Sequence, residues 1–256
     1  MIHETAIIDP SAKIAEGVEI GAYSVIGADV TIDAGTWVGP HVVICGPTTI
    51  GKNNKIYQYA SVGADPQDRK FHGEVAYLEI GDDNIFREFC TINRGTEGGG
   101  ALTKIGNDNL FMAYVHIAHD CIVNNHTIFA NNASLAGHVT VEDHAIISGF
   151  AAVHQFVHIG QHSFVAGTAC VLRDVLPFVL VSGNPGEPHG LNTVGLKRRG
   201  FSSDIVMGLR RAYKVIYRQG LTTKEALAEL EAMLTEVPEV QMLIDGLNKS
   251  ERGIAR

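Results

Sequence analysis

Apolar residues recur along this chain at every sixth position. The first run continues from residue 2 to residue 62 without a slip, and the same spacing returns after each of two interruptions. A spacing of six fits neither a 3.6-residue helix nor an alternating strand. It is typical of a hexapeptide β-solenoid, in which each hexad supplies one short strand and one turn. The repeat positions are Ile2, Ile8, Ile14, Ile20, Ile26, Ile32, Val38, Ile44, Ile50, Ile56 and Val62, then Ile80, Phe86 and Ile92, and finally Ile105, Phe111, Ile117, Val123, Phe129, Leu135, Val141, Ile147, Val153, Ile159, Val165 and Val171.

Glycine often follows the repeating apolar residue. Since glycine tolerates backbone conformations that other residues avoid, we expect the chain to turn tightly at these positions. They are Gly21, Gly27, Gly39, Gly51, Gly81, Gly106 and Gly160.

The repeat predicts a solenoid domain over residues 1–185, followed by a helical domain over 190–256. Two segments break the six-residue phase, roughly 64–79 and 95–104. Both are expected to be loop insertions, which often carry function when they leave a rigid scaffold.

Capping signals divide the C-terminal region into helices. A first helix is predicted to begin at Ser202 or Ser203. Thr222 and Glu225 predict a capping box at the start of a second, and a shorter helix is expected near 239–247.

Composition narrows the class of protein. A net charge of -8 over 256 residues argues against a nucleic-acid binder. The chain has neither an apolar run long enough to span a membrane nor a signal-peptide pattern, so we expect a cytoplasmic protein without stable membrane insertion. Four scattered cysteines without metal-site spacing are expected to be reduced, and they are Cys45, Cys90, Cys121 and Cys170.

Three hexads per coil place residues eighteen apart in one column, about 4.8 Å from each other. This predicts a cluster on one part of the surface. The three columns are His119, Gly137 and Gln155; Asp120, His138 and Phe156; and Ala118, Ala136 and His154.

The cluster has the composition of a general-base site. Histidine is the usual general base in proteins, which suits His119 to this role, and Gly137 offers a bare backbone N–H to a developing oxyanion. Asp120 adds a carboxylate, although neighbours in a strand point to opposite faces, so a contact with His119 does not follow from the spacing. A histidine on a solenoid is alternatively a plain surface residue. Three other histidines that are also eighteen residues apart form a histidine ladder, to which we assign no chemistry. They are His126, His144 and His162.

Two other classes of protein remain open at this point. A γ-type carbonic anhydrase would be a zinc hydratase with a pair of histidines five residues apart, and no two histidines here have that spacing. The second class that remains open is a non-catalytic solenoid used as an assembly scaffold. Cys121 has no activating base, so direct transfer without a covalent intermediate fits better than nucleophilic catalysis.

Basic residues gather in the C-terminal region, where Asp204 is the only acid among them. In an acidic chain this predicts an acidic partner or phosphates, the alternative being a solvated helix face. The basic residues are Lys197, Arg198, Arg199, Arg210, Arg211, Lys214 and Arg218.

Five stretches together resemble the UDP-N-acetylglucosamine acyltransferases, and the similarity covers essentially the whole chain. These stretches are QDRK (67–70), HIAHDC (116–121), ANNASLAGHV (130–139), AVHQF (152–156) and GLKRRGFS (195–202). The resemblance implies a left-handed parallel β-helix that forms a homotrimer with sites between subunits. The implied reaction moves an (R)-3-hydroxyacyl group from acyl carrier protein to the sugar 3-hydroxyl, the first step of lipid A synthesis. It implies no metal and no organic cofactor.

The resemblance also implies roles for individual residues. His119 would be the general base, Asp120 its orienting partner and Gly137 the oxyanion donor. The sugar nucleotide would contact Gln67, Asp68, Lys70, His116, His138 and Gln155, together with Asn192, Arg198 and Arg199 across the subunit boundary. The acyl groove would include His154 and end at Gly167, which acts as a ruler of chain length.

Two positions depart from the family pattern. Asn93 stands where the family commonly has histidine, and Val194 where it often has glutamate. Both lie near the implied sugar-nucleotide site. A 3-amino UDP-sugar acceptor, giving an amide instead of an ester, is therefore an alternative substrate. The related N-acyltransferase of this pathway carries an extra N-terminal domain, for which this chain, with its repeat starting at Ile2, is expected to lack room.

Overall fold

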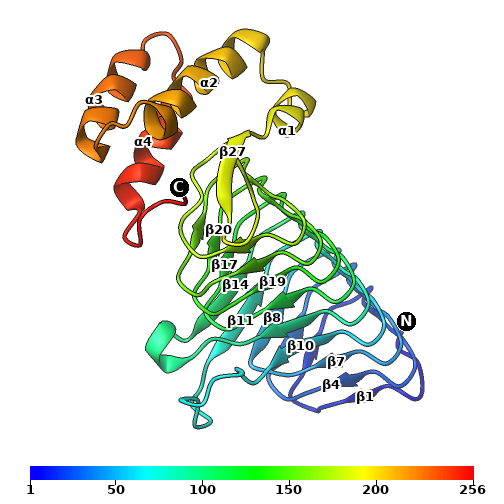
Figure 1. The fold of residues 1–256 in the computed structure, drawn as a ribbon. Coiled ribbons are helices and arrows are strands. Elements are labelled where there is room, and N and C mark those ends of the chain that lie inside the picture. Colours follow the sequence, from blue (N-terminus) through cyan, green and yellow to red (C-terminus); the bar gives the residue numbers. More distant parts are fainter.

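The computed structural model describes residues 1–256, and its strands form three parallel sheets (Figure 1). From β1 to β25 each strand that has a later partner within the coil pairs with the third strand after it, so that one coil of chain contributes one strand to each sheet. Ile7 pairs with Val25, eighteen residues later. The predicted coil of three hexads is therefore confirmed.

The strands are short because each hexad also contains a turn. Sheet A comprises β3 (Glu19–Ile20), β6 (Trp37–Val38), β9 (Lys55–Ile56), β12 (Ile85–Phe86), β15 (Leu110–Phe111), β18 (Ile128–Phe129), β21 (Ile146–Ile147), β24 (Phe164–Val165), β26 (Val179–Ser182) and β27 (Glu187–Leu191). Sheet B comprises β1 (Ile7–Ile8), β4 (Val25–Ile26), β7 (Val43–Ile44), β10 (Ser61–Ala64), β13 (Thr91–Asn93), β16 (His116–Ile117), β19 (Ser134–Leu135), β22 (Ala152–Val153) and β25 (Cys170–Val171). Sheet C comprises β2 (Lys13–Ile14), β5 (Val30–Ile32), β8 (Thr48–Ile50), β11 (Tyr77–Ile80), β14 (Leu102–Ile105), β17 (Ile122–Val123), β20 (Thr140–Val141) and β23 (His158–Ile159).

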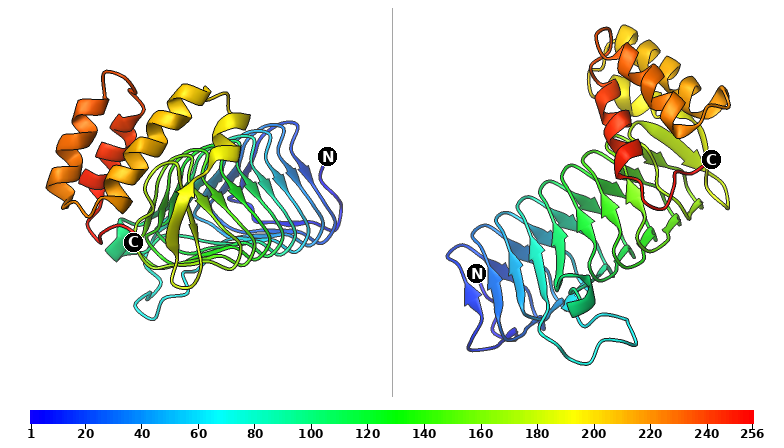
Figure 2. Two further views of the ribbon diagram at one scale, coloured as in Figure 1. Left: turned by 45° about the horizontal axis from the view of Figure 1, so that its top comes forward. Right: turned by 90° about the vertical axis from the view of Figure 1, so that its left-hand side faces the viewer.

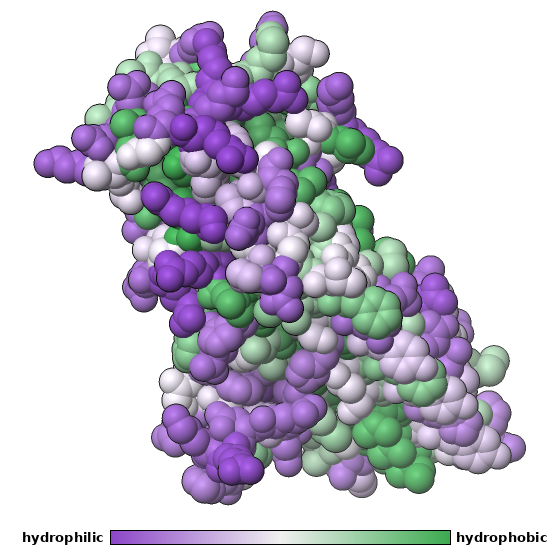
Figure 3. All heavy atoms as spheres, viewed as in Figure 1, coloured by the Kyte–Doolittle hydropathy of each residue, from purple (hydrophilic) through white to green (hydrophobic).

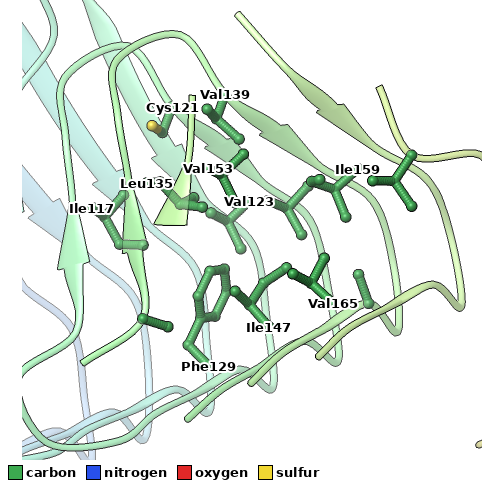
Figure 4. Packing of buried hydrophobic residues seen from close by; sticks show 14 of the residues in the cluster. Ile117, Cys121, Val123, Phe129, Leu135, Val139, Ile147, Val153, Ile159 and Val165 are labelled. Carbon is green, nitrogen blue, oxygen red and sulfur yellow. The ribbon is translucent and has the colours of Figure 1, made fainter. Parts of the chain in front are cut away.

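The repeating apolar residues fill the interior of the prism. Figure 4 shows side chains from successive coils, among them Ile117, Leu135 and Val153, stacked in the space between the sheets. Phe111 packs between two other phenylalanines, with ring centroids 4.8 Å from Phe86 and 5.0 Å from Phe129. Because each coil from the second onward buries the same positions, apolar burial stabilises the coil along most of its length.

The glycines after the repeat residues are not the sites of the special turn conformation, contrary to the expectation. Positive φ falls two residues later, at Tyr23 after Gly21 and at Asn53 after Gly51. Glycine is needed for a different reason, which is close approach between coils. A Cβ on Gly21 would lie 2.6 Å from the backbone nitrogen of Pro40.

Both insertions leave the prism at the B–C corner, the set of turns that join a sheet B strand to the next sheet C strand. The first loop, residues 65–76, joins β10 to β11, and the second, 94–101, joins β13 to β14 and contains the 3-10 turn η1 (Glu97–Gly99). In Figure 1 they project side by side. Both loops end a few residues earlier than the predicted insertions, 64–79 and 95–104, because β11 already begins at Tyr77 and β14 at Leu102.

A hairpin of β26 and β27 covers the end of the coil and leads to four helices. These are α1 (Thr193–Arg198), α2 (Ser203–Arg218), α3 (Thr223–Met233) and α4 (Val240–Lys249). Ser202 caps α2, and Thr222 with Glu225 forms the predicted capping box of α3. The antiparallel hairpin was not predicted, because the hexad pattern has already decayed there.

The helices pack at the C-terminal end of the prism (Figure 2), and the chain then returns to the coil. The side chain of Ser250 donates a hydrogen bond to Asp174, and Lys249 pairs with Glu142. Hydrophilic side chains crowd over these helices in Figure 3. None of the helices combines the length and apolar character that a membrane-crossing segment requires.

The histidine ladder runs along the C–A corner, where sheet C strands turn into sheet A. The rings of His126 and His144 stack 4.7 Å apart, and those of His144 and His162 stack 4.8 Å apart. Burial lowers the pKa of His162 to about 4, so its ring is neutral near pH 7 and packs against Phe178 and Phe201. At the C-terminal end of the ladder, His162 therefore has a packing role.

Candidate active site at the B–C corner

The predicted columns meet at the B–C corner, directly above the two insertions. His119 lies in the turn between β16 and β17, and Gly137 in the next turn, between β19 and β20. The backbone N–H of His138 donates to the carbonyl of His119 at 3.0 Å, and that of Phe156 donates to the carbonyl of Gly137 at 3.1 Å. The eighteen-residue spacing therefore brought these residues together as predicted.

His119 and Asp120 are in direct contact, which the spacing alone did not show. His119 Nδ1 lies 2.7 Å from Asp120 Oδ2. The two side chains converge because Asp120 is a corner residue with a φ of 59°, outside the strand where neighbours alternate. A carboxylate only accepts, so this hydrogen bond places the ring proton on Nδ1 and leaves Nε2 as a free base.

Asp120 is almost completely enclosed, with 1% of its side chain exposed. Its oxygens also accept hydrogen bonds from Thr96 in the second insertion, and its backbone N–H donates to Thr103 at 2.8 Å. Sequence reasoning missed both threonines. Thr96 lies in an insertion that breaks the period, twenty-four residues before Asp120, and Thr103 lies seventeen residues before it, one position off the eighteen-residue column, so the spacing finds neither.

Gly137 is buried directly against the imidazole of His119. A Cβ at this position would lie 2.5 Å from His119 Cε1 and 2.8 Å from Nε2, so only glycine lets the ring approach. The backbone N–H of Gly137 makes no hydrogen bond, as at the matching position of the neighbouring coils. A free donor therefore lies beside the free base.

Two further histidines surround His119. His138 packs edge-on against His119 with ring centroids 5.1 Å apart, and its other side stacks on Phe156. His116 lies on the outer face of β16, where its Nδ1 is 2.7 Å from the hydroxyl of Thr91. Burial lowers the pKa of both His116 and His138, and at His138 the Asp120 carboxylate opposes part of this shift. These rings are therefore held in the neutral form near pH 7.

The first insertion brings Asp68 toward the same corner. The backbone N–H of Lys70 donates to Asp68 Oδ1 at 3.0 Å. This hydrogen bond lowers the pKa of the Asp68 carboxyl, and nearby positive charge, including that of the Lys70 ammonium, adds a smaller lowering. Gln67 and Lys70 are exposed in this loop.

Asn93 and Arg94, at the end of β13, fix the base of the first insertion. Asn93 Nδ2 donates to the carbonyl of Asp65 at 2.7 Å. Arg94 donates to the carbonyl of Gly63 at 2.6 Å and pairs with the Asp65 carboxylate. Asn93, one of the two departures from the family pattern, thus helps to hold the first insertion in place.

The predicted acyl-groove residues lie on opposite sides of sheet B. His154 follows β22 at the B–C corner, where its Nδ1 lies 3.0 Å from the carbonyl of Gln155, whereas Gly167 lies in the turn that precedes β25, at the A–B corner. The outward positions between them carry the small residues Ala152 and Cys170. The outward-facing side chains on the strip across β22 and β25 are therefore small.

The three predicted nucleotide contacts from the C-terminal region do not reach His119 within one chain. They lie at the C–A corner beside the histidine ladder. Asn192 is buried, caps α1 and donates to the carbonyl of His162 at 3.0 Å, while Arg199 donates to that of His144 at 3.0 Å. Arg198 is exposed. A single subunit thus presents the two halves of the predicted site on different corners. The exposed Val194, the second departure, lies in α1 with them.

His119, Asp120 and His138 are also the residues with a spacing suited to a metal ion. Asp120 Oδ2, however, already accepts hydrogen bonds from His119 Nδ1 and from the Thr96 hydroxyl. A metal would have to break both bonds to reach this oxygen. The donor set therefore fits a hydrogen-bonded base better than a metal centre.

A coil of hexapeptide repeats places the chain among the hexapeptide-repeat proteins, and two family models narrow this class to transferases. Residues 1–34 and 102–137 match the family model described as bacterial transferase hexapeptide repeats, and residues 174–255 match the model described as UDP N-acetylglucosamine O-acyltransferase, domain 2.

Full-length relatives then specify the family. The chain is 54% identical over 255 residues to the acyl-[acyl-carrier-protein]–UDP-N-acetylglucosamine O-acyltransferase of Thiobacillus denitrificans, covering 100% of this chain and 99% of that protein. It superimposes with a TM-score of 0.98 on LpxA from Acinetobacter baumannii at 52% identity, covering 100% and 99% of the two chains. The UDP-N-acetylglucosamine O-acyltransferase of Moraxella catarrhalis has the same TM-score at 48% identity and the same coverage.

The chain therefore belongs to the UDP-N-acetylglucosamine O-acyltransferases. Its fold is the left-handed parallel β-helix with C-terminal helices that the resemblance implied. Membership of this family excludes the alternatives of a non-catalytic scaffold and a zinc hydratase.

Proposed function

We propose that this protein transfers an (R)-3-hydroxyacyl group from acyl carrier protein to the 3-hydroxyl of UDP-N-acetylglucosamine, in the cytoplasm, as the first step of lipid A synthesis. The observation that carries the proposal is the His119–Asp120 pair beside the unpaired N–H of Gly137, in a chain that resembles such transferases over its full length.

The geometry supports a direct transfer. His119 Nε2 takes the proton of the sugar hydroxyl as the oxygen attacks the thioester carbon, while the carboxylate of Asp120 stabilises the charged imidazole through Nδ1. The N–H of Gly137 stabilises the oxyanion that forms. The C–S bond then breaks, and His119 returns the proton to the thiolate of the carrier.

The decisive experiment offers the protein several (R)-3-hydroxyacyl carrier thioesters together with UDP-N-acetylglucosamine and its 3-amino analogue. Product masses with both acceptors in competition give the preference directly, and hydroxylamine distinguishes an ester from an amide. We expect the ester of UDP-N-acetylglucosamine. Acylation of the amino sugar alone would replace the proposed acceptor, and no acyl transfer to either would refute the proposal.

We propose that the active protein is a homotrimer with each site completed by a neighbouring subunit. The support is the separation within one chain of His119, at the B–C corner, from Arg198, at the C–A corner. Flat-sided prisms that pack in a closed ring bring two different corners together.

Mixing two inactive variants is expected to restore turnover. A His119→Ala subunit lacks the base but keeps Arg198, and an Arg198→Ala subunit keeps the base. In randomly mixed trimers, about a quarter of the sites combine both intact residues. Activity should therefore rise to that share of the wild-type rate, with each variant alone as the control. Failure to complement in a verified mixed trimer would contradict a shared site.

Acyl carrier protein, as an acidic partner, is proposed to dock on the exposed stripe of α2. Arg210 and Lys214 line a groove between α2 and β27 together with His189. Arg211, on the same face, is already paired with Glu236 at 2.6 Å. Arg210 and Lys214, which form no ion pair within the chain, therefore keep their charges available to a partner.

Reversing these two charges is expected to raise the KM for the acyl carrier substrate about tenfold at low salt and to leave kcat nearly unchanged. The variant is Arg210→Glu with Lys214→Glu, compared by steady-state kinetics at several salt concentrations. Lys224→Glu, a matched change on α3, is the control and should behave as the wild type. An unchanged donor KM would show that this stripe is only solvated.

The acyl chain is proposed to lie across the outer face of sheet B, from His154 toward Gly167. The small side chains at Ala152 and Cys170 leave room for it. At Gly167 an added Cβ would meet only the carbonyl oxygen of Gly149, at 3.3 Å, so a side chain there requires that carbonyl to shift by only a few tenths of an ångström.

Gly167→Met is expected to shorten the preferred acyl chain. Each buried CH₂ contributes about 0.8 kcal/mol, or about fourfold in discrimination per carbon. The wild type should prefer a donor of about fourteen carbons over one of about ten, and the variant should reverse that order, as measured with competing donors by product mass. If the preference does not change, another residue sets the length.

A further inference from the structure

The second insertion closes over the carboxylate that holds His119. Thr96, which is buried, spans both oxygens of Asp120. Its backbone N–H donates to Oδ1 at 2.8 Å, and its hydroxyl donates to Oδ2 at 2.7 Å. His119 Nδ1 shares the same Oδ2 at 2.7 Å. Two donors from one residue, one on each oxygen, fix the plane of the carboxylate and hence the point to which the imidazole donates.

Gly99 in the same insertion lies flat against this carboxylate. A Cβ on Gly99 would lie 2.1 Å from Asp120 Cγ, whereas a Cβ on Gly98 would meet nothing within 4 Å. The close approach excludes solvent from one side of the carboxylate, in agreement with its 1% exposure. In water-excluded surroundings charge-assisted hydrogen bonds are stronger and less adjustable.

We infer that Thr96 is a positioning residue for the transfer, which sets the direction of His119 through the carboxylate of Asp120 and touches no substrate itself. The inference rests on the proposed function of His119. The second insertion thereby has a catalytic purpose distinct from that of the first, which carries Asp68. Displacing a base by a fraction of an ångström from its acceptor lowers the chemical rate more than substrate binding.

Thr96→Val removes the hydroxyl and keeps the shape and the backbone N–H. We expect kcat to fall about tenfold, as for one hydrogen bond to a charged group, with the KM for UDP-N-acetylglucosamine within about twofold of the wild type. Thr96→Ser restores the hydroxyl and should recover kcat to within about twofold. Thr223→Val, an exposed threonine on α3 without a hydrogen bond, is the matched control. Gly99→Ala should lower kcat at least as much as Thr96→Val, and Gly98→Ala should not.

A coupling experiment separates positioning from a general effect on structure. In an Asp120→Ala background, Thr96→Val should cause no further loss, because its partner is absent. A full second loss in that background, a rise in KM in place of a fall in kcat, or wild-type kcat in Thr96→Val would each overturn the inference. His119→Ala is measured alongside. If that variant keeps turnover, the proposed function itself fails, whereas an inactive His119→Ala with a fully active Thr96→Val refutes only the role of Thr96.

Discussion

Replacing His119 by alanine is expected to lower kcat by a factor of ~10²–10⁴, the usual contribution of a general base. The ring is the group whose Nε2 is free and whose Nδ1 is held by Asp120 at 2.7 Å. Steady-state turnover of the carrier-bound donor measures the loss. The fold should be retained, because the side chain of His119 lies at the rim of the coil, partly exposed, and is absent from the apolar core.

His41→Ala is the matched control for this variant. His41 is an exposed corner histidine that stacks between Tyr23 and Tyr59 at the A–B corner, away from His119. Its removal should leave kcat unchanged. A folded His119→Ala protein, verified by circular dichroism, that turns over near the wild-type rate would sink the assignment of the base.

Gly137→Ala is expected to lower kcat about a hundredfold, since a catalytic group displaced by about 1 Å loses that much rate. The added methyl would lie 2.5 Å from His119 Cε1, so the imidazole must move out of line with its acceptor. The backbone N–H of residue 137 is kept, and the loss therefore reports the position of the base. The same kinetic assay measures it.

Gly98→Ala provides the comparison, because it adds the same methyl near the site in open space. The Gly98→Ala variant should retain the activity and the thermal stability of the wild-type protein. If Gly137→Ala is as active as Gly98→Ala, then the ring of His119 is free to shift without cost, and the tight packing of the two coils has no catalytic purpose.

The hexad period was sufficient to predict the coil and much of the cluster at the B–C corner. Because residues eighteen apart must stack in a three-sided coil, His119 was placed beside Gly137 without any structure, and His138 and Gln155 were placed at the same corner. The capping box at Thr222 was predicted because it depends only on residues three apart. Local spacing controls all of these features.

The sequence by itself therefore determined the coil, its period and the residues of each column, because a regular repeat converts sequence separation directly into distance. Only the tertiary structure decided what depends on corners and insertions. The contact between His119 and Asp120 follows from the left-handed backbone of Asp120, and the contact between Asp120 and Thr96 follows from a loop that breaks the period. The hairpin of β26 and β27 forms where the repeat has ended, so its pairing depends on packing against the last coil. Such contacts are set by three-dimensional packing, for which a one-dimensional period holds no information.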